Sequence, residues 1–107
     1  MKNLASKLRQ RITIEEPVYT SDLLGGFVTA WNVYATLWAE IVPVGRIENL
    51  RSEKLQNANS YKITVRYIPN ITTKMRISHK GKFYAIRSVI NVEEKNEKLE
   101  IIANEEV

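Results

Sequence analysis

The sequence predicts a small, mainly β protein: an antiparallel barrel or sandwich of about six strands with one inserted α-helix. Three observations lead to this prediction. The chain has 107 residues, which is the size of a single domain. Apolar and polar residues alternate with a period of two in several short segments, as they do in half-buried strands. One longer segment changes instead to the period of a helix.

The clearest strand is expected at residues 61–67. Two tyrosines there share one parity with Ile63 and Val65, and polar residues occupy the other parity. This arrangement places the tyrosine rings on the core side of the strand rather than on its solvent face. Further strands are expected at 12–15, 31–42, 74–79, 82–92 and 99–103, with turns at Pro69-Asn70, Lys80-Gly81 and 93–97.

Two irregularities are expected inside these strands. Pro17 should end or bulge the first strand, because proline cannot donate a ladder hydrogen bond. The alternation between Lys82 and Val92 slips near Ser88, which predicts a β-bulge there.

The strand at 31–42 has apolar residues on both faces, as expected of a central strand or of one at a subunit contact. Leu37, Ala39 and Ile41 share one face, and Trp38 lies on the other. Trp31 and Trp38 are interpreted as core residues, with an interface role as the alternative.

The segment Tyr19–Ala30 predicts a long loop or loose hairpin. It contains turn-forming residues, including a Gly-Gly pair, but it also carries Leu23, Leu24 and Phe27. Apolar residues exposed on a loop are common partner-binding sites, so these three are candidate contact residues.

The helical period lies between Arg46 and Ala58, so an inserted helix is expected at 46–59. The first ten residues predict a short helix or an N-terminal arm. The chain 1–107 is expected to form one domain.

Charge is arranged in blocks whose sum is +4. Residues 1–14 hold four basic residues and no acidic one, and 15–53 carry a net charge of −4. Residues 54–92 hold eight basic residues and no carboxylate, whereas the last fifteen residues carry −4. The basic block could face phosphate or an acidic partner. Equally, the Glu-rich C-terminus could lie beside it and neutralise it within the monomer.

Residue counts disfavour catalysis. There is no Cys, and there is one His (His79) and one Asp (Asp22), which leaves no triad, zinc knuckle or His-rich metal site. We therefore expect no catalytic, metal-binding or cofactor-binding residues, and no cofactor. No segment approaches the roughly 20 apolar residues of a membrane span, so no membrane partner is expected.

A nucleic-acid-binding protein is the alternative function. Basic residues of the 54–92 segment interleave with aromatic ones, as in an OB-fold whose rings stack on bases. The core-side parity of the tyrosines at 61–67 argues against such a stacking platform and leaves contact with the phosphate backbone open.

The order of several short motifs resembles the head–tail joining proteins of tailed bacteriophages and prophages, the head-completion adaptor or stopper family. The similarity runs from about Leu8 to Ala103. It is carried by Leu8-Arg9-Gln10-Arg11-Ile12-Thr13-Ile14, then Asp22, Gly25, Gly26 and Trp31, the run Thr36–Ile41 before Pro43, Gly45-Arg46, Ile63–Tyr67, and Gly81, Tyr84, Ile86 and Val89.

The resemblance implies a structural virion protein without catalysis, namely a β-barrel subunit of a connector ring that completes the DNA-filled head and provides the surface where the tail docks. A dodecameric ring is one option. The implied partners are the phage portal or adaptor protein and a tail or tail-terminator protein, with non-specific contact to packaged DNA as a further option. The implied location is the virion, after assembly in the host bacterial cytoplasm. The candidate subunit or partner contacts are Leu23, Leu24, Phe27, Arg46 and Arg51.

Overall fold

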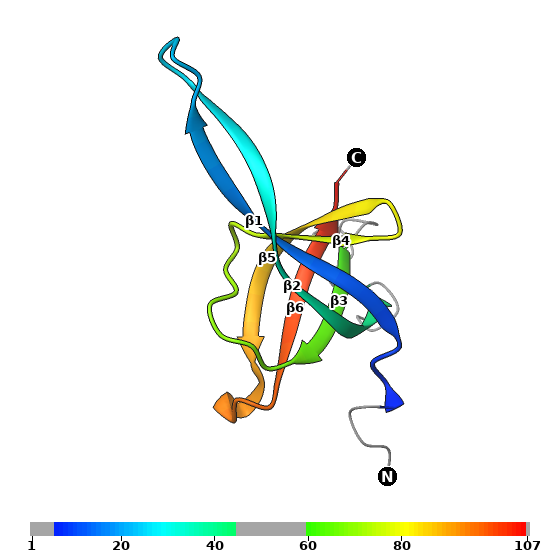
Figure 1. Ribbon diagram of the computed structural model, residues 1–107. Helices are drawn as coiled ribbons and strands as arrows, with labels where there is room; N and C mark the ends of the chain where they lie inside the picture. Colours follow the sequence, from blue (N-terminus) through cyan, green and yellow to red (C-terminus); the bar gives the residue numbers. More distant parts are fainter. Residues whose placement is uncertain (1–5, 45–59, 107) are drawn as a thin grey trace, which may run out of the picture.

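The computed structural model describes residues 6–44 and 60–106, which form an antiparallel β-barrel (Figure 1). Its six strands close in the order β1-β2-β3-β6-β5-β4. The strands are β1 (Gln10–Ser21), β2 (Phe27–Pro43), β3 (Ser60–Arg66), β4 (Arg76–His79), β5 (Lys82–Asn91) and β6 (Lys98–Glu105), and a 3₁₀ turn (Val92–Glu94) joins the last two. The mainly β fold class is confirmed. The helix expected at 46–59, with Arg46 and Arg51, lies outside the described residues.

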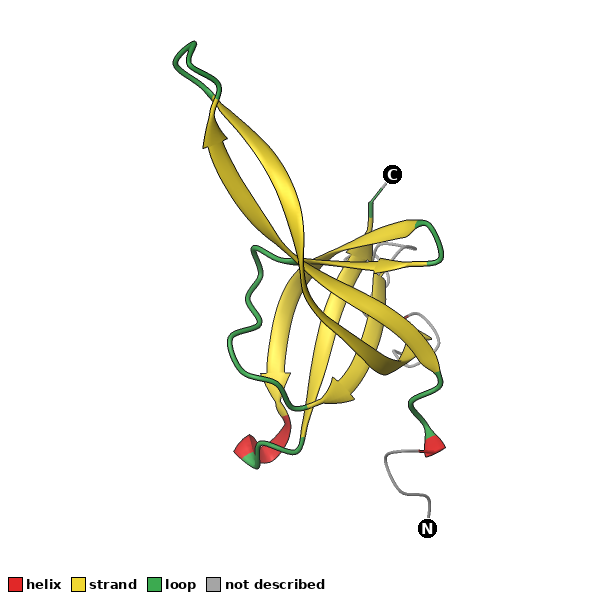
Figure 2. Cartoon of the chain, viewed as in Figure 1, coloured by secondary structure: helices red, strands yellow, loops and turns green. Residues whose placement is uncertain are grey.

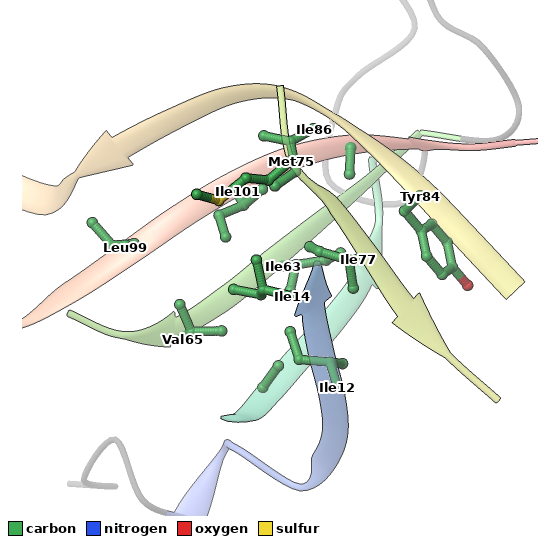
Figure 3. Close-up of a cluster of buried hydrophobic side chains, with 12 residues drawn as sticks. Ile12, Ile14, Ile63, Val65, Met75, Ile77, Tyr84, Ile86, Leu99 and Ile101 are labelled. Atoms are coloured by element: carbon green, nitrogen blue, oxygen red, sulfur yellow. The ribbon is translucent and has the colours of Figure 1, made fainter. Parts of the chain in front are cut away.

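The core fills the barrel because every strand directs alternate side chains inward (Figure 3). The largest fully buried side chains are Ile12, Ile14, Ile63, Val65, Ile77 and Ile101. They come from β1, β3, β4 and β6, so the core joins strands that are far apart in the sequence. Each such side chain contributes about 1.5–3 kcal/mol through its removal from water.

In the part of the chain that the structure describes, no helix is long and apolar enough to cross a membrane.

Two of the expected local features are confirmed. The register between β5 and β6 shifts between Ile86 and Ser88, which is the predicted bulge. Between β4 and β5, Lys80 and Gly81 both have positive φ (52° and 83°), the geometry of a tight hairpin turn.

The expectation for Pro17 is wrong, because β1 continues past it to Ser21 and pairs Pro17 with Trp31. The physical reason is the number of strands that pair with β1 at this point. β4 pairs with β1 only at Thr13–Glu15, so beyond Glu15 the strand has β2 as its one partner among the described strands. A strand with one free edge tolerates proline.

A second bulge, which the alternation did not predict, lies in β2. Ile14 pairs with Ala35 and Glu15 pairs with Val33, so Tyr34 is the extra residue. Its hydroxyl donates a hydrogen bond to the carbonyl oxygen of Pro69 (2.8 Å). The bulge reverses the parity of β2, so Trp31 and Trp38 lie on the same, outward side of the β1–β2 ladder although seven positions separate them.

Candidate assembly surface

The β1–β2 hairpin extends well beyond the barrel, as Figures 1 and 2 show. We call residues 16–32 the hairpin arm. Its strands pair with each other in register from Glu16↔Asn32 to Ser21↔Phe27. The arm contributes to an elongated molecule whose longest dimension is 55 Å, against 32 and 27 Å for the others. Of the two alternatives for residues 19–30, the hairpin is therefore confirmed, in a regular rather than a loose form.

A hydrogen-bonded turn closes the arm. The Asp22 amide donates to the Gly26 carbonyl oxygen (3.0 Å). Asp22 Oδ1 accepts hydrogen bonds from the amides of Leu24 (2.8 Å) and Gly26 (2.9 Å). These bonds stabilise the carboxylate and lower the pKa of Asp22. Gly25, at φ 92°, supplies the left-handed residue that the turn requires.

The tip of this turn presents large apolar side chains to solvent. Leu23 is 90% exposed, Leu24 is 89% exposed and Phe27, at the start of β2, is 73% exposed. Leu23 also has φ 69°, a conformation that costs a residue with a Cβ about 1 kcal/mol. The arm thus brings three of the candidate contact residues together at its tip, where the described part of the chain leaves them exposed.

Arg76 attaches the base of the arm to the barrel. Its Nε donates a hydrogen bond to Glu15 Oε1 (2.6 Å), and both side chains are mostly buried. Its guanidinium carbon lies 4.2 Å from the centroid of the Trp31 ring and 3.9 Å from that of Phe83. We call these four residues the Arg76 clamp. One β4 side chain therefore contacts β1, β2 and β5, and its charge is satisfied within the molecule.

The C-terminal glutamates neutralise part of the basic block, as one of the two alternatives predicted. Lys62 lies 3.6 Å from Glu100, and Lys82 lies 3.6 Å from Glu105. The pairing of β6 with both β3 and β5 creates these contacts. Four basic residues of the block form no ion pair within residues 6–44 and 60–106: Arg66, Lys74, Lys80 and Arg87.

Most of the aromatic residues in the basic segment 54–92 do not form a platform on which bases could stack. The rings of Tyr61 and Tyr84 meet edge to face with centroids 5.3 Å apart, and both pack with the core. Burial raises the pKa of Tyr84. Phe83 is covered by Arg76, and only Tyr67 is exposed. The core-side position expected for the tyrosines holds for Tyr61 and fails for Tyr67, where the strand has ended.

A shallow groove lies on the outer wall of the barrel near the start of β1. Its lining residues are Leu8, Arg11, Thr36, Leu37, Trp38 and Arg66. The Arg11 guanidinium lies over the Trp38 ring, 4.9 Å from its centroid. Trp38 is 52% exposed, so the interpretation of it as a core residue is wrong. The signal was present in the sequence, because Trp38 has the opposite parity to the inward-facing Leu37 and Ala39.

Within the described ranges, no group of three or more His, Asp or Glu side chains could hold a metal ion. His79 lies at the end of β4 and its Nε2 is 3.2 Å from Gln10 Oε1 in β1. Its partial burial, together with Lys80 and Lys82, lowers its pKa. His79 therefore belongs to the seam where β4 closes on β1.

The comparisons with known proteins agree with this architecture. The chain matches the family described as phage head completion protein over residues 4–106. Its structure is similar to that of protein SF1141 from Shigella flexneri 2a, with a TM-score of 0.75 and 26% identity over 96% of each chain. It is also similar in fold to a chain from the virion of a native gene transfer agent particle, with a TM-score of 0.68 and 23% identity, over 94% of this chain and 96% of that one. Curated proteins give no significant match.

Proposed function

The chain belongs to the phage head completion protein family, a structural family of the virion, and we propose that it acts there as a subunit of the head–tail connector. In this role, as a stopper or adaptor, it forms a ring with other copies, completes the DNA-filled head and offers the surface where the tail docks. Its partners are the portal or adaptor protein on one side and a tail protein on the other. Assembly takes place in the host bacterial cytoplasm.

The hairpin arm is the observation that carries this proposal. A closed barrel needs no arm for its own stability, because none of the buried residues of the core cluster comes from the arm. The arm instead exposes Leu23, Leu24 and Phe27 on an ordered turn. Complete burial of each of these side chains in an interface would contribute about 1.5–3 kcal/mol. A protein that works by contact with neighbours accounts for this exposure.

The proposal is tested by mixing the purified protein with portal–adaptor complexes and measuring association by sedimentation velocity. Leu23→Asn removes the apolar side chain and places at φ 69° a residue that tolerates this conformation. The variant should therefore fold at least as well as the wild type, yet its association should weaken more than tenfold.

Ile90→Asn is the matched control, because Ile90 is also an exposed apolar residue but lies on the barrel. It should leave association unchanged. Equal binding by wild type and Leu23→Asn, or no association of the wild type with the complexes, would refute the proposed role of the arm.

No observation favours the alternative, a nucleic-acid-binding protein that uses the basic segment 54–92. Lys62, Arg76 and Lys82 form ion pairs with glutamates of the same chain. Tyr61 and Tyr84 pack with the core. DNA contact through the remaining basic residues would be non-specific, as expected of a connector close to packaged DNA.

A further inference from the structure

We propose that the groove around Trp38 receives the hairpin tip of a second copy of this chain. The tip comprises residues 22–27, and the groove is the one lined by Leu8, Arg11, Thr36, Leu37, Trp38 and Arg66. This inference rests on the proposed function and deepens it, because it specifies which two surfaces join neighbouring subunits.

The two surfaces have complementary chemistry. The tip is apolar and acidic: Leu23 and Leu24 are almost fully exposed, and Asp22 beside them carries its only charge. In fact, every charged residue between positions 12 and 45 is acidic. The groove is apolar and basic, with the exposed indole of Trp38 between two arginines. Apolar contact would supply affinity, and the opposite charges would orient the tip.

The arginines of the groove are available for such a contact. Arg11 stacks on Trp38, and neither Arg11 nor Arg66 forms an ion pair within the described part of the chain. Arg66 lies opposite Lys98 in the β3–β6 ladder, which adds positive charge. Glu40 is the nearest acidic residue along β2, but it does not line the groove. Trp and Arg are also the residues that most often dominate interface energetics.

The position of the two surfaces makes the contact intermolecular. Arg11 and Asp22 lie eleven positions apart along the chain, one near the start of β1 and the other just after its end. At about 3.3 Å per residue, the strand separates them by about 36 Å. Figure 1 shows the start of β1 on the side of the barrel away from the tip. A tip therefore cannot reach the groove of its own subunit.

This arrangement favours head-to-tail assembly. Each subunit has one tip and one groove on different parts of its surface, so a subunit that donates its tip still has a vacant groove. Contacts of this heterologous kind propagate from copy to copy and end only when a ring closes. The proposed contact is thus sufficient in principle for the ring that a connector requires.

Disulfide trapping tests the contact directly, because the chain has no cysteine of its own. Leu24→Cys places a thiol on the tip and Thr36→Cys places one in the groove. The two variants are mixed in equal amounts under mild oxidation, both alone and with portal–adaptor complexes, and the mixed disulfide is followed by non-reducing electrophoresis. We expect it to form at least ten times faster than in a control mixture of Leu24→Cys with Thr73→Cys.

Thr73→Cys is a matched control, since Thr73 is exposed on the β3–β4 connection and does not line the groove. Adding Arg11→Glu to Thr36→Cys should reduce the rate to the control level, because it reverses the charge opposite Asp22. Equal rates for the groove and control mixtures, in both settings, would overturn the inference. A tip-to-tip disulfide that forms faster than the mixed one would overturn it as well.

These outcomes are separable from those of the connector proposal. If Leu23→Asn abolishes association with portal–adaptor complexes but the groove thiol reacts no faster than the control, the connector role stands and the tip has another receptor. If the groove thiol reacts selectively but no association with head complexes occurs, self-assembly stands and the connector role fails.

Discussion

The two halves of β1 share one backbone conformation but have opposite environments. In the half Gln10–Glu15, β2 and β4 both pair with the strand, and Ile12 and Ile14 are buried in the core. In the half that forms the arm, β2 is the only paired neighbour among the described strands, and the residues from Val18 onward are exposed. The difference teaches that the number of neighbouring strands, more than apolar content, decides burial along this chain.

The largest expected effect is a loss of stability when an apolar side chain is shortened to alanine in the barrel, compared with the same kind of change in the arm. Ile101→Ala in the barrel removes a fully buried side chain and should lower the free energy of unfolding by about 2–5 kcal/mol. Leu24→Ala in the arm should change it by less than about 0.5 kcal/mol, because Leu24 is exposed. Urea denaturation followed by circular dichroism measures both. Similar losses in the two variants would mean that the arm is part of the cooperative core.

An intermediate effect is expected where the two regions meet. Arg76→Met keeps the length of the side chain but leaves the mostly buried Glu15 without its partner. The loss in the free energy of unfolding should be about 1.5–3 kcal/mol in the same denaturation experiment, the usual value for a hydrogen bond to a charged group. Lys74→Met, at an exposed position of the same charge, is the control and should be nearly neutral. A neutral Arg76→Met would show that the clamp does not stabilise the base of the arm.

The smallest expected effect is a pH dependence of folding stability that arises from His79 in the barrel. The pKa of His79 is lowered from its ordinary 6.5 by burial and by the adjacent lysines. As the pH falls through this ordinary value, the unfolded chain therefore binds the proton first, and stability decreases until the folded pKa is passed. Thermal unfolding at pH 7.5 and pH 5.5 should show a drop in Tm that is smaller in His79→Gln. An equal drop in both proteins would assign the dependence to other groups.

The alternation of apolar residues was sufficient to predict most of the barrel. It located the core strands and the Ser88 bulge, because inward positions such as Ile63 and Ile101 must alternate wherever one face is buried. It failed where that constraint ends. Pro17 and the Tyr34 bulge are decided by which strands lie alongside, and pairing partners distant in sequence leave no local signal.

The candidate site was predictable in part for a related reason. Leu23, Leu24 and Phe27 were recognisable because exposed apolar residues beside turn-forming ones are conspicuous. The groove was not, because Leu8, Trp38 and Arg66 come from separate segments that only the closed barrel brings together. For the basic segment 54–92, which includes Arg76, the sequence allowed either an external partner or neutralisation by the C-terminal glutamates, whereas the fold pairs Arg76 with Glu15 of β1.

The Arg76 clamp also affects how the arm would respond to a force applied at its tip. Its one guanidinium contacts side chains on three other strands at the place where the hairpin leaves the barrel wall. A push on the tip is thereby shared among several strands of a closed cylinder instead of bending a single pair of strands at a hinge. Such a projection would resist bending at its base and hold its tip at a fixed position relative to the barrel.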